Sequence, residues 1–413
     1  MNIAIIADDY LPHSTRVAAK MLHELAHSLK EMGHNIVVIT PEVFQKEKLK
    51  IDDFEDICIW RFKSGQLKIS NLVRRAINES LLSVRAWKAI KNKVQSNTFD
   101  LVIYYSPSIF FGTLVKKIKK TCACPSYLIL RDFFPQWTID AGLIKKGSLK
   151  EHYFRIFETI NYKNANRIGL MSEKNQIVFN THTKNIYQTE ILRNWAKLKP
   201  HQKETNTPSL REKLKLQSKT IFFYGGNIGY AQDMANLMQL VKKMQAFPQA
   251  HFVFLGQGDE VSLINHLAIE WKLKNFSYLP SVSQEEFKNI LCEIDIGLFS
   301  LAKHHTIHNF PGKLLGYMVQ SIPILGSVNE GNDLMPLVNN TGAGFISVNG
   351  EDETLFENAK LLLQNIDLRK QMGHNGYQLL KNEFDVQKIA EQIVESAKKE
   401  ITSYGTKSVR TKN

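Results

Sequence analysis

Two kinds of segment alternate along the chain: short apolar runs, and longer stretches with apolar residues every three or four positions. Runs such as NIAIIA and NIVVIT predict strands buried on both faces, as in a parallel sheet. Residues 15–32 between them carry apolar residues on one helical face, and Gly33 is suited to terminate that helix. This unit of strand, helix and strand predicts the start of a doubly wound α/β sheet.

The same alternation continues, stops in a polar stretch at 198–218, and then restarts. A chain of 413 residues is longer than one hydrophobic core usually grows. We therefore predict an α/β fold of two Rossmann-like domains that face a cleft. The predicted parts are a first domain at 1–197, a linker at 198–218, a second domain at 219–384, and a closing helix with a basic tail at 385–413 that crosses back to the first domain.

The stretch NFPGKLLGYMVQSIPILGSVNEGN reads as turn, short helix, buried strand and polar loop. Pro311 suits the first turn of a helix, and Gly312 lets a ligand approach the backbone. Lys313 is disfavoured by the helix dipole unless an anion is bound there, which favours a phosphate or diphosphate site. The alternative is a basic residue at an ordinary junction. After the strand, a polar loop that could hold a sugar hydroxyl contains Glu330, Gly331 and Asn332.

Two further candidate sites also follow predicted strands. The turn GGNIG, with Gly225, Gly226 and Asn227, lies between a strand and a helix, although such glycine patterns also recur by chance. Arg131 and Asp132 directly follow the strand SYLIL and are the best catalytic candidates of the first half. The alternative is that this arginine and aspartate pair with each other or with a capping backbone group.

Composition and charge restrict the class of protein. No apolar run reaches the ~18–20 residues that a membrane-spanning helix needs, and the amino terminus does not resemble a signal peptide, so we expect cytoplasmic residence. The net charge of +13 indicates an anionic partner. Residues 63–95 are basic and amphipathic, which favours attachment to an anionic membrane surface, although a packed helix with a solvated basic face would look the same. No RNA- or DNA-binding motif is visible.

Four segments together resemble the GT-B glycosyltransferases of the large GT4 family, most closely bacterial transferases that add N-acetyl-L-fucosamine or a near relative during O-antigen or capsule assembly. These segments are DDYLPHSTRVAAKMLHELAHSLKEMGHNIVVITP, RDFFPQWTIDAGLI, FFYGGNIGYAQDM and NFPGKLLGYMVQSIPILGSVNEGND. The resemblance implies a UDP-sugar donor bound mainly by the second domain and an acceptor bound mainly by the first. It also implies a retaining reaction, no cofactor and no essential metal.

The chain departs from this family pattern at several positions. Many members carry two glutamates eight positions apart, and these positions fall on His308 and Gly316 here. The arginine and lysine that often follow the glycine turn are replaced at about Asn227 and Gln232. Lys313 is the obvious substitute for the missing charge, and Glu330 could replace the glutamate that binds ribose.

The resemblance and the residues together suggest a role for each candidate. Lys313 and Asp132 are the expected catalytic residues, and Ser281 and Val282 are where a uracil is expected. His304, His305 and His308 are clustered without a carboxylate or cysteine, so we expect no metal site there. The expected acceptor-binding residues are Arg16, Arg131, Asp132 and His308.

The expected partner of the enzyme is a polyprenyl-diphosphate-linked saccharide acceptor at the inner face of the cell membrane, and no nucleic acid. Two other classes stay open. A UDP-sugar epimerase on the same fold would need no acceptor. A non-catalytic basic module would bind membrane or nucleic acid and ignore free UDP.

Overall fold

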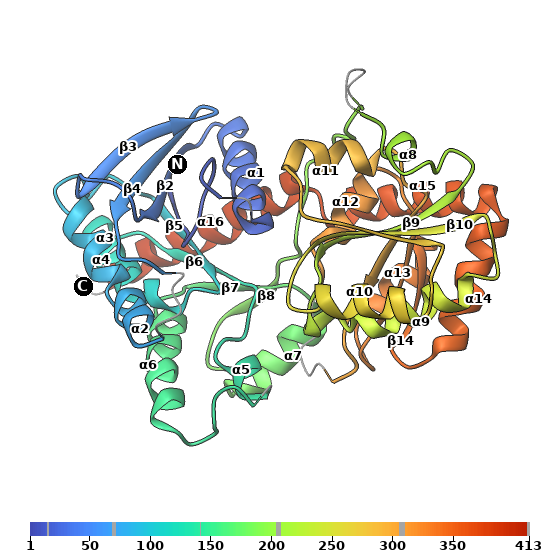
Figure 1. The fold of residues 1–413 in the computed structure, drawn as a ribbon. Coiled ribbons are helices and arrows are strands. Elements are labelled where there is room, and N and C mark those ends of the chain that lie inside the picture. The colour runs from blue at the N-terminus through green and yellow to red at the C-terminus, as the bar shows by residue number, and fades with distance from the viewer. Residues whose placement is uncertain (15, 68–71, 141, 204–207, 305–309, 411–413) are drawn as a thin grey trace. The chain divides into compact units, whose positions relative to one another are not determined.

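The computed structural model describes residues 1–14, 16–67, 72–140, 142–203, 208–304 and 310–410. The chain divides into two compact units, one formed by Met1–Arg193 with Val386–Asn413 and the other by Asn194–Asp385 (Figure 1). The predicted linker 198–218 lies inside the second unit. Arg211 holds it there, because its guanidinium donates to the backbone oxygens of Glu293, Leu216 and Lys219 and pairs with Asp295 at 2.6 Å.

The described part of the first unit contains an eight-stranded sheet with the order β3-β4-β2-β1-β5-β6-β7-β8. All its neighbouring strands are parallel except β3 and β4, which form an antiparallel hairpin at the edge. The strands are β1 (Asn2–Ile6), β2 (Asn35–Glu42), β3 (Leu49–Phe54), β4 (Ile57–Lys63), β5 (Leu101–Ser106), β6 (Ser126–Leu130), β7 (Arg167–Leu170) and β8 (Thr189–Ile191).

Helices cover this sheet, and its central strands β1, β5 and β6 are almost entirely buried between them (Figure 1). The helices are α1 (Val17–Glu31), α2 (Leu72–Ser80), α3 (Leu82–Ile90), α4 (Gly112–Cys122), α5 (Gln136–Asp140), α6 (Leu149–Lys163), α7 (Glu173–His182) and α16 (Val386–Arg410), with a 3-10 turn η1 (Ile109–Phe111). The basic region 63–95 therefore forms two short helices rather than one, because the chain turns at Leu81 between α2 and α3.

The last helix, α16, belongs to the first unit although the whole second unit lies before it in the sequence. It packs against α1 and β6. The Ser396 hydroxyl donates to the Glu190 carboxylate at 2.8 Å, and the side-chain amide of Gln392 donates to the Ile191 carbonyl at 2.6 Å. These bonds attach the end of the chain to β8. No helix in the described residues is long and apolar enough to span a bilayer.

The described part of the second unit contains a six-stranded sheet in which all neighbours are parallel, with the order β11-β10-β9-β12-β13-β14. Its strands are β9 (Thr220–Asn227), β10 (Ala250–Gln257), β11 (Phe276–Leu279), β12 (Ile296–Ser300), β13 (Ile324–Val328) and β14 (Gly344–Val348). The order reverses direction at β9 and β12, which is a topological switch point of the kind where α/β proteins bind ligands.

The helices of the second unit alternate with its strands along the chain. They are α8 (Leu210–Lys213), α9 (Met234–Met244), α10 (Val261–Glu270), α11 (Gln284–Leu291), α12 (Lys313–Val319), α13 (Leu334–Asn340), α14 (Asp352–Gln364) and α15 (Ile366–Glu383), with a 3-10 turn η2 (Tyr230–Gln232). The core on one face of the sheet joins apolar residues of β9, β10 and β12 to those of α9 and α14. This packing fixes the strand ends that carry the candidate site.

The ends of β9 and β10 approach each other too closely for a side chain. Gly256 has φ +152°, and a Cβ atom there would lie 1.8 Å from the carbonyl oxygen of Gly226. Gly350 has a positive φ of +108°, and a Cβ atom there would have nothing within 4 Å. Glycine is thus required at Gly256 for space as well as for backbone conformation.

Replacing Gly256 with alanine should therefore destabilise the protein more than the matched change Gly350→Ala. Both changes strain a positive-φ position by about 1–2 kcal/mol, and Gly256→Ala adds a clash that overpacking studies place at about 1–3 kcal/mol. Denaturant unfolding of both variants measures the difference. Equal losses would show that β9 and β10 can separate at this point without cost.

Candidate functional site

The carboxyl ends of the parallel strands bring the candidate residues of the second unit to one edge of its sheet. The glycine turn ends β9, Ser281 and Val282 follow β11, and Glu330 follows β13. The segment that leads to Lys313 follows β12. Because the sheet is parallel throughout, these segments all leave it on the same side, as the sequence analysis requires of a ligand site.

The glycine turn is held in shape by its neighbours. The Tyr224 hydroxyl donates to the Asn227 carbonyl, and the Asn227 side-chain amide donates to Gln232 at 2.7 Å. Gly226 is exposed with φ +127°. Asn227 and Gln232 stand near the positions where family members often carry a cationic pair, and here they bind each other. The turn itself thus offers exposed backbone and no positive charge.

The positive charge comes from Lys313, the first residue of α12. Its ammonium nitrogen is buried, and among the described residues it has no hydrogen-bond partner. It lies 3.5 Å from the centroid of the Tyr224 ring, a cation–π contact, and 3.5 Å from where a Cβ of Gly226 would be. Burial lowers the pKa of Lys313 to about 7. The structure thus brings Lys313 and the glycine turn together.

The first turn of α12 lies beside this turn because Tyr317 anchors the helix to the sheet. The Tyr317 hydroxyl donates toward the carbonyls of Phe223 and Leu298, at 3.1 and 3.2 Å, and accepts from the Gly225 N–H at 3.3 Å. Sequence analysis did not single out Tyr317. The Pro311 carbonyl accepts from the Leu314 N–H at 3.1 Å, but Pro311 itself lies two residues before Lys313, outside the first turn of α12 where the sequence placed it.

The remaining candidates of the second unit differ in how free they are to bind a ligand. Glu330 and Gly331 are exposed, and Gly331 has φ +72°. Asn332 is buried, and its amide is already used: it donates to Asn329 at 3.0 Å and accepts from the Leu334 N–H. Ser281 is exposed and donates to Gln257 at 3.3 Å. Asn332 therefore shapes the loop that presents Glu330.

In the first unit, Arg131 and Asp132 follow β6 as predicted. Arg131 is only 7% exposed, and its guanidinium donates to the Arg193 carbonyl at 3.0 Å. Burial lowers the pKa of Arg131 to about 10 and raises the pKa of Asp132 above its usual value. The charges of Arg131, Asp132 and Asp8 all act on the pKa of Tyr105, so the ends of β1, β5 and β6 gather these groups at one edge.

Two other expected acceptor residues have different outcomes. Arg16 lies just before α1, is about half exposed, and pairs with Asp8 at 3.9 Å and Asp9 at 3.5 Å. Its charge is thus shared with two carboxylates before any ligand arrives. His308 lies outside the described residues. The roles of Arg16, Arg131, Asp132 and His308 stay predictions.

A cavity of about 570 Å³ opens at the carboxyl ends of β1, β2 and β4, at the same edge of the first unit. Its lining includes both acids of the loop that follows β1, together with a histidine and residues from two other strand ends. The residues that matter most here are Asp8, Asp9, His13, Glu42 and Arg61. Sequence analysis did not single out the residues that line this cavity.

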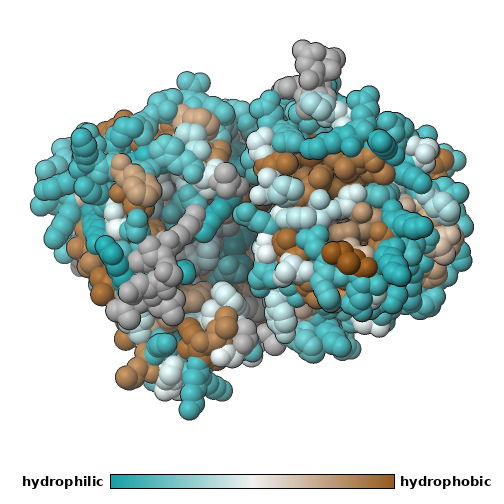
Figure 2. Space-filling view, in the orientation of Figure 1, coloured by the Kyte–Doolittle hydropathy of each residue, from teal (hydrophilic) through white to brown (hydrophobic). Residues whose placement is uncertain are grey.

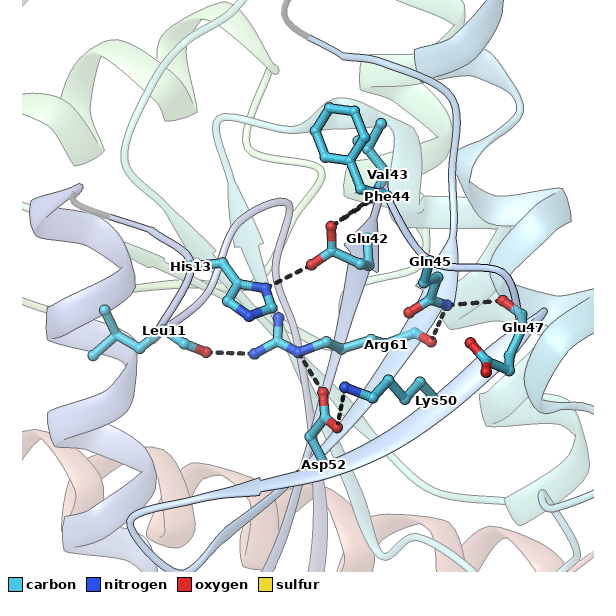
Figure 3. A network of polar contacts seen from close by, with 10 residues as sticks. All are labelled: Leu11, His13, Glu42, Val43, Phe44, Gln45, Glu47, Lys50, Asp52 and Arg61. Carbon is cyan, nitrogen blue, oxygen red and sulfur yellow. Dashed lines mark hydrogen bonds and ion pairs between the residues drawn. The ribbon is translucent and has the colours of Figure 1, made fainter.

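Figure 3 shows the polar network that builds the wall of this cavity. Arg61 is 2% exposed, and its guanidinium donates to the Leu11 carbonyl at 2.6 Å and to Asp52 at 3.0 Å. Lys50 pairs with the other oxygen of Asp52 at 2.9 Å. A buried arginine with these partners fixes the loop that follows β1 against the β3–β4 hairpin.

On the opposite side of the network, His13 and Glu42 form a pair at 2.7 Å (Figure 3). Burial raises the pKa of Glu42, but hydrogen bonds from His13 and from the N–H groups of Phe44 and Val43 together lower it below its usual value. Glu42 is therefore ionised at neutral pH and can orient the His13 ring. The cavity offers acidic and imidazole groups that suit the hydroxyls of a sugar.

Comparison with known proteins identifies the second unit. Residues 206–379 match the family model described as glycosyl transferases group 1. This match lies within the second unit, which is therefore similar to the group 1 glycosyltransferases over these residues. The chain is 24% identical over 228 residues to the probable glycosyltransferase WbjE of Pseudomonas aeruginosa, which covers 53% of this chain and 54% of WbjE. The match thus spans about half the length of this relative.

A longer match joins the chain to WcaI of Escherichia coli (strain K12), assigned as a colanic acid biosynthesis glycosyl transferase. The identity is 21% over 320 residues, which covers 70% of this chain and 74% of WcaI. Both relatives are glycosyltransferases by description, and one is placed in the biosynthesis of a polysaccharide.

Solved structures show the fold of the whole chain. Sucrose-phosphate synthase from Thermosynechococcus elongatus superposes with a TM-score of 0.74 at 14% identity, over 97% of this chain and 99% of that one. WaaG, described as a glycosyltransferase involved in lipopolysaccharide biosynthesis, gives 0.64 at 13% identity over 96% and 99%. HepE of Anabaena with UDP and glucose gives 0.68 at 14% identity over 96% and 99%. The prediction of two α/β units of the GT-B class is confirmed.

The buried ammonium of Lys313 has a measurable consequence for stability. Its pKa is about 7 in the folded protein and 10.5 as a model value, so the unfolded chain binds more protons between these values. The free energy of unfolding should then rise with pH by up to about 1.4 kcal/mol per unit over this range. Replacing Lys313 with methionine removes the free-energy cost of burying the ammonium group.

We therefore expect Lys313→Met to stabilise the ligand-free protein near neutral pH, by roughly 2–4 kcal/mol before the lost cation–π contact is subtracted. The gain should shrink as the pH approaches 10.5. Denaturant unfolding of parent and variant across this pH range measures it, with Lys274→Met, an exposed position, as control. A Lys313 variant that is less stable at every pH would contradict the burial argument.

Proposed function

We propose that this protein is a retaining glycosyltransferase that moves a sugar from a UDP-sugar to a polyprenyl-diphosphate-linked saccharide in the assembly of a bacterial surface polysaccharide. The observation that carries the proposal is the buried ammonium of Lys313 beside Gly226, at the strand ends of a group 1 glycosyltransferase domain. Support for a UDP donor comes from HepE, whose solved complex holds UDP and glucose.

The leaving group of such a reaction is a diphosphate, which must be stabilised as its negative charge develops. Lys313 suits this task because it is held out of water without a hydrogen-bond partner among the described residues. An anion would supply the missing partner and raise the lysine pKa again. The exposed backbone of Gly226 and Asn227 lets the diphosphate approach. Glu330, exposed after β13, is assigned to the ribose hydroxyls.

The acceptor is assigned to the first unit. Asp132 is a half-buried carboxylate whose pKa is raised by burial, which suits a group that positions or helps to deprotonate an acceptor hydroxyl. The cavity lined by Asp8, His13 and Glu42 extends the surface available to a saccharide. No step of this scheme uses a metal ion. The donor sugar is proposed to be N-acetyl-L-fucosamine or a related N-acetyl amino sugar, on the sequence resemblance alone.

Binding of nucleotides by thermal shift tests the donor site. UDP should stabilise the protein strongly and uridine only weakly, because Lys313 acts on the diphosphate that uridine lacks. Ligand at ~100 times its dissociation constant adds about 2.7 kcal/mol to the free energy of unfolding. In Lys313→Met, most of the difference between the stabilisation by UDP and that by uridine should disappear. Asp132→Asn should keep this difference but have a lower turnover rate.

Calorimetry adds a signature that a merely structural lysine would not give. Near pH 8 most Lys313 side chains are neutral in the free protein, since the pKa is about 7, and diphosphate binding should return the proton. Titrations in buffers of different ionisation enthalpy should show proton uptake by the parent and not by Lys313→Met. Equal stabilisation by UDP, GDP and ADP, or the same response in parent and variant, would remove the donor-site assignment.

We further propose that the first unit attaches to the anionic inner face of the membrane through α2 and α6. These helices are neighbours, since the Tyr153 hydroxyl bonds to Ser80 and to the Ala76 carbonyl. Leu149 and Ile156, seven positions apart on α6, are 89% and 59% exposed. Hydrophobic surface gathers over the α5 and α6 region in Figure 2.

Exposed basic residues lie on the same two helices or just before α6: Arg74, Arg75, Lys145, Lys146 and Lys150. Exposed apolar side chains beside cations are the pattern of an interfacial membrane site. Each basic residue near an anionic surface contributes ~1 kcal/mol, and salt screens this attraction.

Vesicle sedimentation tests this attachment. Anionic vesicles should capture the protein at low salt and release it at high salt, and Leu149→Asp should weaken capture because it places a charge at the interface. The matched control is Ile269→Asp on α10 of the second unit, at a residue that is 78% exposed. Equal binding to neutral and anionic vesicles, or equal loss in both variants, would contradict the proposal.

A further inference from the structure

Three side chains of the first unit converge at a place that the proposed reaction does not use. His23 and His27 are four positions apart on α1, so both rings leave the same face of the helix. Glu55 reaches the same point from the turn between β3 and β4. One ligand atom from each of these residues lies within 4.8 Å of the other two.

The distances between these atoms fit one ion. The two Nε2 atoms of His23 and His27 are 3.2 Å apart, and Glu55 Oε2 lies 3.1 Å from the first and 3.7 Å from the second. For bonds of about 2.0–2.1 Å, a tetrahedral zinc ion separates its ligand atoms by roughly 3.3 Å. The triangle in this structure is close to one face of that tetrahedron.

The surroundings fix the ligands in place. His23 is 6% exposed, and its other ring nitrogen lies 2.9 Å from the Tyr10 hydroxyl. A phenol hydroxyl can accept the Nδ1 proton, and the Nε2 lone pair of His23 then faces the other two ligand atoms. Such a hydrogen bond from the second nitrogen is usual for metal-binding histidines.

The turn that carries Glu55 is also held against α1. Glu55 and Asp56 form a two-residue connection in which both have positive φ, at 47° and 61°. The Lys30 ammonium of α1 donates to the Asp56 carbonyl, and the Asp56 N–H donates to Asp53 at 3.1 Å. Glu55 itself has a side chain that is 63% exposed, so a water molecule can complete the coordination from the open side.

We propose that His23, His27 and Glu55 form a binding site for a divalent transition-metal ion of the zinc class. Two imidazoles and one carboxylate suit this class, whereas Mg²⁺ and Ca²⁺ prefer oxygen ligands. The ion joins α1 to the β3–β4 hairpin. Through His23 it also orients Tyr10, which lines the cavity of the first unit. The site is independent of the proposed transfer reaction.

Direct metal binding tests the proposal. The full-length protein, freed of metal by a chelator, is titrated with Zn²⁺ in competition with a chromophoric chelator. We expect one tightly bound Zn²⁺ per chain, which also raises the melting temperature, and no such effect of Mg²⁺. His27→Gln and Glu55→Gln should each weaken binding by more than about tenfold, because losing even an outer-shell partner costs about that much.

The matched control is His266→Gln. His266 and Glu270 are also four positions apart, with atoms at 3.4 Å, but both are exposed, and no described residue supplies a third ligand, so this variant should bind Zn²⁺ like the parent. Unfolding curves without metal check that each variant is folded. The alternative is a hydrogen-bonded relay from Tyr10 through His23 to Glu55. A parent without stoichiometric Zn²⁺, or variants that keep its full affinity, would overturn the metal site and favour the relay.

Discussion

The candidate donor site depends on a cation kept out of water. The Lys313 ammonium is buried over the Tyr224 ring, and no hydrogen bond from the described residues compensates for its lost hydration. Removing a charge from water costs several kcal/mol unless a partner restores it. The fold therefore maintains an unfavourable interaction at this point. Such a group is stabilised when an anion binds, which links the stability of the second unit directly to its ligand.

The rest of the second unit holds this cation in place. Tyr317 anchors α12 to the carbonyls of two strands, and the close approach of Gly256 to Gly226 keeps the glycine turn beside the helix. The position where many family members have a cation after the turn is taken by Asn227, which binds Gln232. In the proposed donor site, the charge of Lys313 on α12 takes the place of those cations. Lys313 can reach this place because the glycine turn and the segment that leads to α12 lie at the same edge of the sheet.

The cavity of the first unit is walled by paired charges, whereas the candidate donor site of the second unit contains the single buried charge of Lys313. Arg61 is buried with Asp52 and a backbone carbonyl, and His13 is paired with Glu42. These networks order the loop that follows β1 and shape a cavity. Each of the four side chains, Arg61, Asp52, His13 and Glu42, has a polar partner. A neutral, hydroxyl-rich ligand needs such an ordered polar wall, whereas a diphosphate needs net positive charge. This contrast agrees with the proposal that the first unit binds the acceptor and the second unit binds the donor.

By itself, the sequence determined the alternation of strands and helices, because apolar periodicity is a local property that packing preserves. It also placed Gly225, Gly226 and Asp132 at strand ends, because they come after apolar runs, and it placed Lys313 at the start of a helix. Only the tertiary structure decided which of these groups meet. Tyr317 contacts Phe223 across 94 positions, and Glu55 reaches His23 across 32, so no pattern along the chain could reveal either contact. For the same reason, the sequence could not show that the Asn332 amide is not available to a ligand. In the structure it is hydrogen-bonded to Asn329 and to the Leu334 N–H.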